Sequence, residues 1–462
     1  MVILILSALL TSAAFEPIGI WYLAIAGYAL FLRSLNTSRV PIATAFIFGL
    51  VVNAIVLHWT GKYVGVLPWL LLSLLQALFY IPVGFTYKKT SSLRWALFAL
   101  ILCEELRARF PFGGFSWTRI AFSQSESPFV PLVSYGGVLV LSYITLLLAL
   151  LISQLRLKGL IFAGVSIFLV GLMPGNPKPV DSIELIAIQG NTPSVGLEFN
   201  SRAKAVFNLH RDVTRDLVEP GNDAIIWPEN AIDIDPRNYP DVMDDIRSLV
   251  KDLDTPLIAG VVLSENGSPA NASILYGLDG DVKSIYLKRY LTPFGEFIPL
   301  RKLAEFVSPY ASSVNDFKEG SDVVVHEIAG EKVAPIICYE IINDGLVREA
   351  SKKSGALIVQ TNSATFARTA QSSQQMAITR IRAIEHSREI LSVSTVGISA
   401  FIDNNGTVKR ATGENISTSI TGDLYLSEYQ TIADRLGGVA PLLILLVSLL
   451  AALPINRRVS VQ

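Results

Sequence analysis

Two apolar regions of the chain enclose a long region of mixed polarity. Residues 1–175 contain a series of long apolar runs separated by short polar loops. Residues 180–430 mix short apolar runs with amphipathic stretches, and residues 436–455 are apolar again. A helix needs about 20 apolar residues to cross a bilayer. The pattern predicts an α-helical polytopic membrane domain, a water-facing domain and a final transmembrane helix.

The apolar runs predict about eight membrane spans, seven before the polar region and one after it. The first run is short, but no basic residues precede it and a second run follows at once, which favours a membrane anchor over a cleaved signal peptide. We expect the spans near residues 2–14, 18–34, 42–60, 66–86, 93–108, 130–153, 158–174 and 436–455.

Basic residues gather in alternate loops between these spans, without acidic residues beside them. In chain order these residues are Arg33, Arg39, Lys88, Lys89, Arg94, Arg156 and Lys158, and the C-terminal tail adds Arg457 and Arg458. Under the positive-inside rule, loops of this kind face the cytoplasm. The region 180–430 is therefore expected on the extracytoplasmic face of the membrane.

A few polar residues lie near or within the predicted spans. Glu104, Glu105 and Arg107 have two interpretations: a polar site within the membrane, or paired and solvated residues at the membrane interface. Their place at the outer end of the fifth span favours the second interpretation. His58 is interpreted as an interfacial or packed histidine, and Cys103 as a small apolar packing residue.

Composition agrees with a membrane protein and excludes several other classes. Hydrophobic residues make up 51% of the 462 residues and charged residues 17%, with a mean hydropathy of +0.46. These values are too apolar for an ordinary soluble protein. The net charge of -1 gives no reason to expect a nucleic-acid partner. Two cysteines and four histidines without ligand spacing indicate neither a disulfide framework nor a metal site, and no cofactor is expected.

Short apolar runs alternate with helical patterns across residues 180–430. Helices are expected up to residue 219, over 239–253, up to 353 and over 371–387. Buried strands that alternate with helices predict a layered α/β domain. Strands are expected at 183–189, 223–229, 256–263, 271–278, 332–340, 355–362, 390–396 and 399–406.

Three predicted strand ends carry residues with complementary chemistry. Glu229 ends "IIWPE", Lys288 follows a short strand and Cys338 ends "APIIC". Any one of them is more often a solvated loop residue, a helix cap or a packing residue. Together they suffice for acyl transfer, because a thiolate attacks a carbonyl, a carboxylate accepts the thiol proton and a lysine stabilises the oxyanion. A helix that begins after Cys338 is expected to favour the thiolate through its dipole.

The order Glu229, Lys288, Cys338, within "WPE", "LKRYLTPFGE" and "CYE", resembles the nitrilase superfamily. The resemblance implies an αββα sandwich over residues 180–430. It implies that Glu229 is the general base, Lys288 the oxyanion stabiliser and Cys338 the nucleophile.

Three further residues match supporting positions of that superfamily. Glu296 and Glu340 match acids that support the site, and Tyr339 matches an aromatic residue beside the nucleophile. Glu340 is expected to help fix the lysine rather than to accept the proton. The chain departs from the family pattern at Tyr290, where histidine is frequent, and at Ser363, where an acid is frequent, so the loop around Ser363 is in doubt as part of the substrate entrance.

The flanking spans make the chain similar to the apolipoprotein N-acyltransferase family, which is bacterial and embedded in the cytoplasmic membrane. That resemblance implies transfer of an acyl chain from a phospholipid, expected to be phosphatidylethanolamine, through a thioester on Cys338. The acceptor would be the α-amine of the diacylglyceryl-modified N-terminal cysteine of an apolipoprotein. The apolar stretch 297–310 is either an arm that enters lipid or a part of the core.

Two other functions remain open. A membrane-tethered amidase or nitrilase would use the same three residues on a soluble substrate, although a single anchor would suffice for it. A transporter or scaffold with an inactive soluble domain would need none of the three. The predicted spans also lack charged residues in their middle, which disfavours a transporter.

Overall fold

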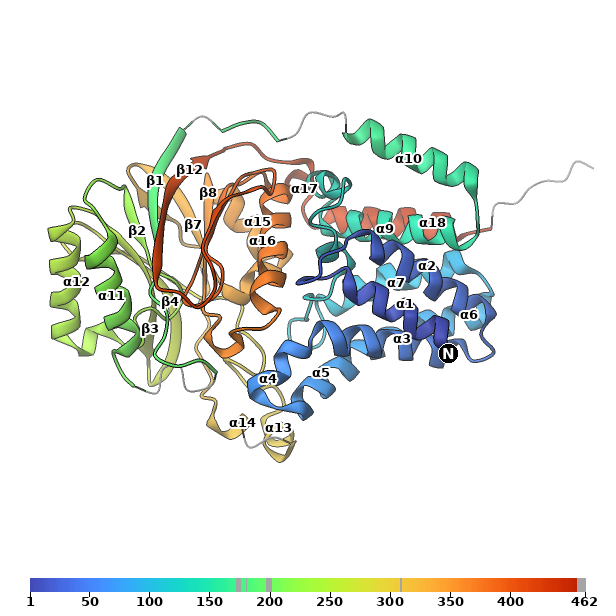
Figure 1. Ribbon diagram of the computed structural model, residues 1–462, viewed down its shortest axis with the longest axis horizontal. Helices are drawn as coiled ribbons and strands as arrows, with labels where there is room; N and C mark the ends of the chain where they lie inside the picture. The colour runs from blue at the N-terminus through green and yellow to red at the C-terminus, as the bar shows by residue number, and fades with distance from the viewer. Residues whose placement is uncertain (172–175, 180, 197–201, 308–309, 455–462) are drawn as a thin grey trace, which may run out of the picture. The chain divides into compact units, whose positions relative to one another are not determined.

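The computed structural model describes residues 1–171, 176–179, 181–196, 202–307 and 310–454 (Figure 1). The chain divides into two compact units. The helical unit comprises Met1–Leu57, Leu70–Met173 and Gly438–Gln462, and the sandwich unit comprises His58–Trp69 and Pro174–Gly437. The basic tail with Arg457 and Arg458 and the end of the seventh expected span lie outside the described residues.

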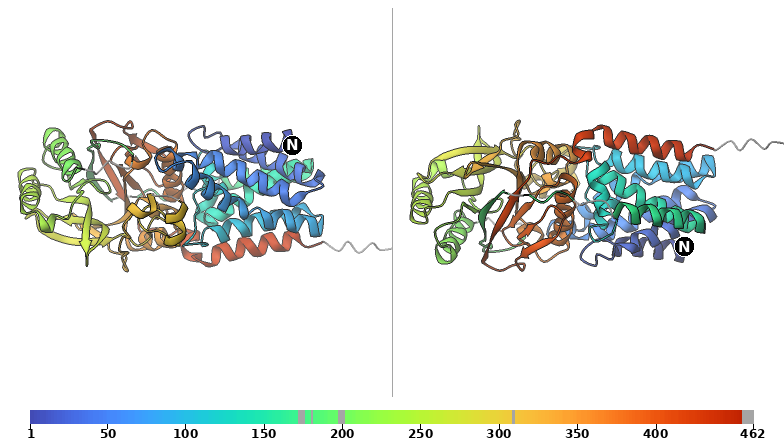
Figure 2. Two further views of the ribbon diagram at one scale, coloured as in Figure 1. Left: turned by 90° about the horizontal axis from the view of Figure 1, so that it is seen from below. Right: turned by 90° about the horizontal axis from the view of Figure 1, so that it is seen from above.

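Each of the expected spans coincides with a helix or a helix pair. Neighbouring helices run alongside one another in the helical unit (Figure 2). The helices are α1 (Val2–Ala13), α2 (Tyr22–Thr37), α3 (Pro41–Val56), α5 (Val66–Leu78), α6 (Ile81–Thr90), α7 (Leu93–Arg107), α8 (Val133–Gly136), α9 (Val138–Ser153), α10 (Leu157–Gly171) and α18 (Val439–Ala452).

Length and composition single out few of these helices as membrane-spanning. Among the described residues, α5 and α6 together, Val66–Thr90 with 25 residues, are long and apolar enough to cross a bilayer. The bent pair Pro41–Val56 and His58–Val64 would form a second span. Val2–Ala13, Val138–Ser153 and Val439–Ala452 are apolar but shorter. The eight spans therefore stay a prediction.

Glu104, Glu105 and Arg107 are buried, at 4%, 6% and 3% exposure. The expectation that they are solvated at the interface is wrong, because a polar loop packs against the end of α7. The guanidinium of Arg107 donates to Thr118 Oγ1 over 2.9 Å, and Arg119 pairs with Glu105 over 3.4 Å. The expected pairing is confirmed, and the pairs join α7 to this loop.

The other two residues of the predicted spans differ in their surroundings. Cys103 is buried at 6% exposure, which confirms its packing role. His58 is exposed, and its ring meets the ring of Trp69 edge-on at 5.0 Å.

Two six-stranded sheets form the centre of the sandwich unit, in the orders β12-β1-β2-β3-β4-β5 and β11-β10-β9-β8-β7-β6. The strands of the first are β1 (Asp181–Gln189), β2 (Ala224–Ile226), β3 (Leu257–Glu265), β4 (Ser268–Tyr276), β5 (Val282–Leu287) and β12 (Thr418–Leu426). Those of the second are β6 (His326–Ile328), β7 (Glu331–Ile337), β8 (Ala356–Thr361), β9 (Ile390–Ser394), β10 (Ala400–Ile402) and β11 (Val408–Ala411).

Helices cover the outer face of each sheet, which gives the expected αββα sandwich. In Figure 1, α11 (Ala205–Leu217) and α12 (Pro240–Asp252) lie outside the first sheet, and α15 (Asp344–Lys353) and α16 (Gln371–His386) lie outside the second. One apolar core joins the facing surfaces of the sheets, with members such as Leu185 and Ile358. A second core lies between the first sheet and its helices, with Trp227 at its centre. Burial of such surface is the main stabilising term of the layers.

Parallel pairing places the catalytic candidates at neighbouring strand ends. β1 to β3 are parallel neighbours in the first sheet, and β7 to β9 are parallel neighbours in the second. In α/β sheets, ligands bind at the carboxyl ends of the strands. The ends of β2, β7 and β8 carry Glu229, Cys338 and Asn362, so this edge of the sandwich is the place to look for a site.

Candidate active site

A buried ammonium group joins two carboxylates at this edge. Lys288 Nζ donates to Glu229 Oε1 over 3.0 Å and to Glu296 Oε1 over 2.8 Å. Lys288 is 1% exposed, Glu229 5% and Glu296 7%. The structure thus brings together three of the residues that the sequence singled out, although Glu229 lies far from the other two in the chain.

Backbone and amide donors hold both carboxylates in place. The amide N–H of Asn362, just after β8, donates to Glu229 Oε2 over 2.9 Å, and that of Thr292 donates to Glu296 Oε2 over 2.7 Å. The side-chain amide of Asn271 on β4 donates to Glu229 over 3.4 Å and also to Glu296. Glu229 therefore has one oxygen on the lysine and one on the backbone, which fixes its orientation.

Burial and the mutual attraction of the buried side chains together set the charges of Glu229 and Lys288. Burial raises the pKa of Glu229, and Lys288 offsets only part of that effect. Burial alone would lower the pKa of Lys288, but Glu229 and Glu296 outweigh it and hold that pKa above its ordinary value. The lysine therefore stays charged, and Glu229 binds a proton more readily than an exposed glutamate would.

Cys338 directly follows β7 and has an uncommon backbone conformation. Its φ is 52°, in the left-handed region that non-glycine residues rarely adopt. Such strain persists where the surroundings impose it, and it is frequent at active sites. Cys338 is half-buried, and desolvation of its thiol first, and then the Glu229 carboxylate, raise its pKa well above the ordinary value, against the opposing effect of Lys288.

The expectation of an α-helix directly after Cys338, whose dipole would favour the thiolate, is wrong because no α-helix begins there. Cys338 is the first residue of a short 3-10 helix, Cys338–Ile342, and α15 begins only at Asp344. A macrodipole effect falls off within one turn of a helix end. A thiol with a raised pKa needs a base to take its proton before it can act as a nucleophile, and Glu229 interacts with this thiol both through its charge and through a hydrogen bond.

Glu340 is fully buried and acts on the backbone on both sides of the site. Burial raises its pKa, although the donors around it oppose that effect. It links the chain just after Lys288 to the chain just before Cys338, so it fixes the lysine through the backbone. Its donors are Tyr286 Oη (2.8 Å) and the backbone N–H groups of Arg289 (2.7 Å), Tyr290 (3.1 Å) and Ile337 (2.8 Å).

Comparison with known proteins places this geometry in a family. Residues 185–434 match the carbon-nitrogen hydrolase model, and residues 7–151 match the apolipoprotein N-acyltransferase N-terminal domain. An apolipoprotein N-acyltransferase of Mycolicibacterium smegmatis is 31% identical over 85% of this chain and 74% of its own. The chain belongs to the apolipoprotein N-acyltransferase family.

Other relatives of the family match over more of their length. The apolipoprotein N-acyltransferase of Vibrio vulnificus is 26% identical over 93% of this chain and 91% of its own. Among solved structures, a CN-hydrolase superfamily protein of Xanthomonas campestris has a TM-score of 0.41 at 17% identity, over 53% of this chain and 91% of its own.

The first departure from the family pattern has a structural counterpart. The ring of Tyr290 lies parallel to that of Tyr339, with an angle of 2° and 5.7 Å between centroids. Tyr339 is buried at 4% exposure. An offset parallel pair of this kind is favourable, so Tyr290 supports Tyr339, the residue beside Cys338, by stacking.

Ser363, where the family frequently has an acid, lies in a loop whose side chains are held by hydrogen bonds. Ser363 is buried, and its hydroxyl accepts from Ser394 over 3.4 Å. Asn362 Oδ1 accepts from the backbone of Ala364 and from Thr395 Oγ1, each over 3.0 Å. The loop is thereby fixed, and its backbone serves Glu229.

Sequence reasoning missed two polar residues of the site. The sequence pattern places Asn271 only within a strand. Asparagine is depleted in strand interiors, so its presence there could have indicated a role in the site. Gln375 on α16 donates to the carbonyl oxygen of Cys338 over 3.5 Å and to Thr361 Oγ1 over 2.9 Å. Only the run of polar residues on a buried helix, "QSSQQ", could have indicated it.

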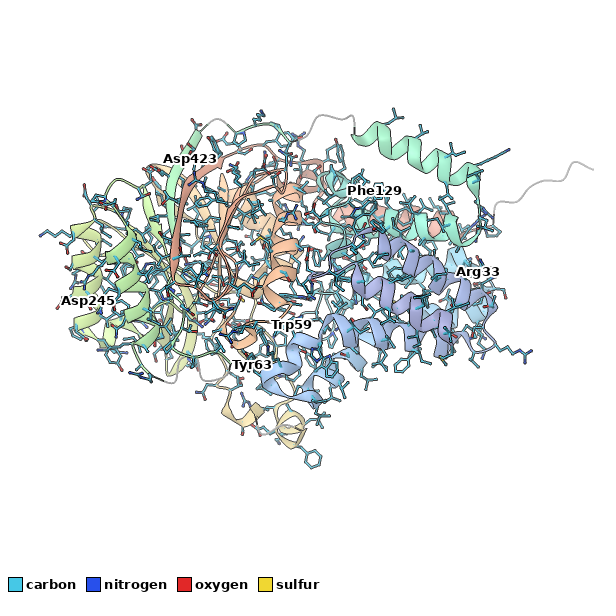
Figure 3. All side chains as sticks on the ribbon, in the orientation of Figure 1. Arg33, Trp59, Tyr63, Phe129, Asp245 and Asp423 are labelled. Carbon is cyan, nitrogen blue, oxygen red and sulfur yellow. The ribbon has the colours of Figure 1, made fainter. Side chains whose placement is uncertain are left out.

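The sandwich unit also includes residues 58–69, which comprise the end of the third expected span, the loop after it and the start of the fourth. Trp59 Nε1 donates to Gln374 Oε1 over 3.0 Å, and the Trp59 ring meets Phe366 edge-on at 4.8 Å. Tyr63 Oη donates to the carbonyl of Ala367 over 3.4 Å (Figure 3). Residues 58–69 therefore pack on the loop that follows Asn362.

Proposed function

We propose that this chain is a membrane N-acyltransferase that transfers a fatty acyl chain from a phospholipid to apolipoproteins. The acceptor is the α-amine of the N-terminal diacylglyceryl-cysteine. Family membership over both units supports this function. The observation that carries it is the buried Glu229–Lys288 pair next to the strained Cys338, which is a set of groups suited to acyl transfer through a thioester.

The first half-reaction acylates the enzyme. Glu229 accepts the proton of the Cys338 thiol while Sγ attacks the ester carbonyl of the phospholipid. The charged Lys288 stabilises the oxyanion of the tetrahedral intermediate. The ester C–O bond then breaks, the proton on Glu229 passes to the departing oxygen, and a lysophospholipid leaves a thioester on Cys338.

The second half-reaction uses the same groups in reverse. The neutral α-amine of the lipoprotein attacks the thioester carbonyl, and Glu229 accepts a proton from the nitrogen. Lys288 again stabilises the oxyanion. The C–S bond breaks, Cys338 Sγ regains the proton from Glu229, and the amide product leaves. The donor product can depart before the acceptor enters, so ping-pong kinetics follow.

Both substrates carry lipid chains, and a membrane domain would bring them to the site. Eight spans with basic loops in the cytoplasm would place residues 180–430 on the extracytoplasmic face. Leucines exposed along α5 and α18, such as Leu70, Leu74, Leu442 and Leu446, suit contact with lipid. Leu303 and Phe306 of α13 (Arg301–Val307) are 59% and 89% exposed, which favours the lipid-entering arm over core packing for the described part of residues 297–310.

The proposed acyl donor is a phospholipid with an ethanolamine headgroup. Phosphatidylethanolamine follows from the family resemblance, and comparison of purified donors with one acyl composition would test it.

Topology is tested separately, by a reporter fused after Ser182 that should be active only outside the cytoplasm. Activity on the cytoplasmic side would contradict the proposed access to lipoproteins.

The decisive test separates acyl transfer from the amidase alternative. With phospholipid and no acceptor, the peptide that contains Cys338 should gain the mass of one acyl chain, and neutral hydroxylamine should remove it. Addition of a diacylglyceryl lipopeptide should move the chain to its α-amine. Cys338→Ala should form neither adduct nor product, whereas Cys103→Ala is the matched control and should behave like the parent. Hydrolysis of small amides without lipopeptide acylation would favour the amidase.

A further inference from the structure

A polar cavity lies in the helical unit, among the loops at one end of its helices. Its volume is about 600 Å³, within the roughly 300–1,000 Å³ of small-molecule sites. All its lining residues belong to the helical unit, and none is a residue of the proposed acyl-transfer site. Its side chains include Arg33, Asn36, Ser92, Arg94, Gln154 and Arg156.

Three arginines from three separate segments of the chain meet at this cavity. Arg33 belongs to the last turns of α2 (Figure 3), Arg94 to the first turn of α7, and Arg156 to the turn between α9 and α10. No aspartate or glutamate lines the cavity, and the segments 33–41, 86–95 and 153–160 contain none. Three cations around one cavity repel one another, and a bound anion would remove that repulsion.

The surrounding groups suit an oxyanion with several acceptor oxygens. Arginine presents a planar fork of N–H donors that matches phosphate in a bidentate manner. Asn36, Ser92 and Gln154 add uncharged donors to the lining. The 15-residue helix α7 begins at Leu93, and Ser92 makes no side-chain capping bond there, so the first-turn N–H groups and the positive end of the helix dipole favour an anion beside Arg94.

We propose that this cavity binds a phosphate group, which either a headgroup of an anionic phospholipid or free inorganic phosphate can supply. The loops that form it are the basic loops that the positive-inside rule assigns to the cytoplasm. A headgroup of the cytoplasmic leaflet would reach it there, and basic pockets between helices on that side suit such headgroups. The occupied cavity ties together the ends of α2, α7 and α9, so the ligand stabilises the helical unit.

Thermal unfolding of the full-length protein in neutral detergent tests the proposal. Phosphatidylglycerol should raise the unfolding temperature, and phosphatidylcholine, whose choline neutralises its phosphate, should raise it less. Inorganic phosphate at matched ionic strength is the second arm. A shift with phosphatidylglycerol alone assigns the ligand as a headgroup, and an equal shift with inorganic phosphate assigns it as free phosphate. No shift with either probe overturns the proposal.

A charge-matched pair of variants separates the cavity from general attraction of anions to basic loops. R33Q/R94Q/R156Q removes the three lining cations. R39Q/K88Q/K158Q removes three exposed cations of the same loop regions that do not line the cavity. Each lost arginine–phosphate contact should weaken binding about tenfold, so the first variant should lose the shift and the second should keep it. Equal loss in both variants would overturn the proposal.

Two further measurements cover a failure of the triple variant to fold. The single substitution R94Q removes one cation and should weaken phosphatidylglycerol binding about tenfold. Native mass spectrometry of the unaltered protein should show phosphatidylglycerol retained in preference to phosphatidylcholine, at a stoichiometry of one. Unaltered retention in R94Q would contradict the site. Thioester formation on Cys338 is measured separately, so failure here is distinct from failure of the proposed acyl transfer.

Discussion

Lys288 donates a hydrogen bond of 3.0 Å to Glu229, and both side chains are buried, at 1% and 6% exposure. Burial of an ion pair costs desolvation free energy that the pair must offset through its contacts. Here Glu296 adds a second carboxylate to the same ammonium at 2.8 Å. One cation between two carboxylates leaves excess negative charge, which favours uptake of a proton by Glu229.

Glu229→Gln should abolish this proton acceptor while it keeps the shape of the side chain. We expect the rate of Cys338 acylation to fall by roughly 100-fold to 10,000-fold, the usual contribution of a general base. Single-turnover formation of the thioester, followed by mass spectrometry, measures that rate. A rate within a few-fold of the parent in folded protein would contradict the role of Glu229.

Glu296→Gln should change the pH profile rather than remove the base. The charge of Glu296 raises the pKa of Glu229, so its removal should lower that pKa. The acylation rate falls as pH falls through the pKa of the base, because protonated Glu229 cannot accept the thiol proton. The acidic limb of the profile should therefore move to lower pH in Glu296→Gln. Movement to higher pH would show that Glu296 acts in another way.

The sequence supplied the strand ends of the site but not the contacts between them. Glu229, Lys288 and Cys338 lie beside short apolar runs that local patterns reveal. Asn271 joins two carboxylates from other segments, and this depends on the pairing of β4 with its neighbours, which no local pattern encodes. The raised pKa of Cys338 likewise follows from desolvation at the site and from Glu229, which lies in a distant part of the chain.

The difference between local patterns and long-range contacts also explains which strands were predicted. The expected strand 183–189 was found as β1, since its apolar run is continuous. Its partner β12 carries a glycine and several exposed or half-buried residues, and β12 was not predicted because it is stabilised by antiparallel pairing with β1. The helices of the predicted spans were found, but a helix and a span differ, since spanning depends on the membrane itself.

Arg382 is predicted to position the turn that follows the nucleophile. It is fully buried on α16 and donates to the carbonyl oxygens of Ile341 over 2.9 Å and Ile342 over 3.1 Å, and to Asp344 over 2.7 Å. Arg382→Lys keeps the charge but cannot make all three contacts. We expect kcat for acylation to fall at least about tenfold with KM nearly unchanged, because each lost contact to a charged group is worth about 1.5–3 kcal/mol.

A purely structural role for Arg382 would give another pattern. Loss of folded protein would lower the yield of active enzyme without changing kcat per active site. Active sites are counted by the thioester burst, and folding is followed by thermal unfolding of the same sample. An unchanged kcat per active site would show that Arg382 does not position Cys338.

Glu340→Gln should disturb both the turn at Cys338 and the backbone that follows Lys288. The carboxylate accepts from three backbone N–H groups and from Tyr286, whereas an amide would direct its own N–H donors at some of them. A buried donor left without an acceptor costs about 1–3 kcal/mol. Both the free energy of unfolding and the acylation rate should fall. Full activity with unaltered stability would contradict the bridging role of Glu340.

His326 should make the stability of the sandwich unit depend on pH. It is fully buried between Ser273 Oγ (3.0 Å) and Ser284 Oγ (2.7 Å), and burial lowers its pKa from 6.5 to about 3. The unfolded chain therefore binds a proton between these pH values that the folded chain refuses. Stability is full above pH 6.5 and falls as pH decreases through this window, by about 1.4 kcal/mol per pH unit for one such group.

His326→Gln isolates that contribution. The substitution should lower stability at neutral pH through weaker packing and hydrogen bonding, but the fall of stability between neutral pH and pH 4 should be shallower by about one proton. Unfolding of the full-length protein by denaturant at several pH values, monitored by tryptophan fluorescence, gives the slopes. Equal slopes in the parent and in His326→Gln would mean that the buried histidine accepts its proton without loss of the fold.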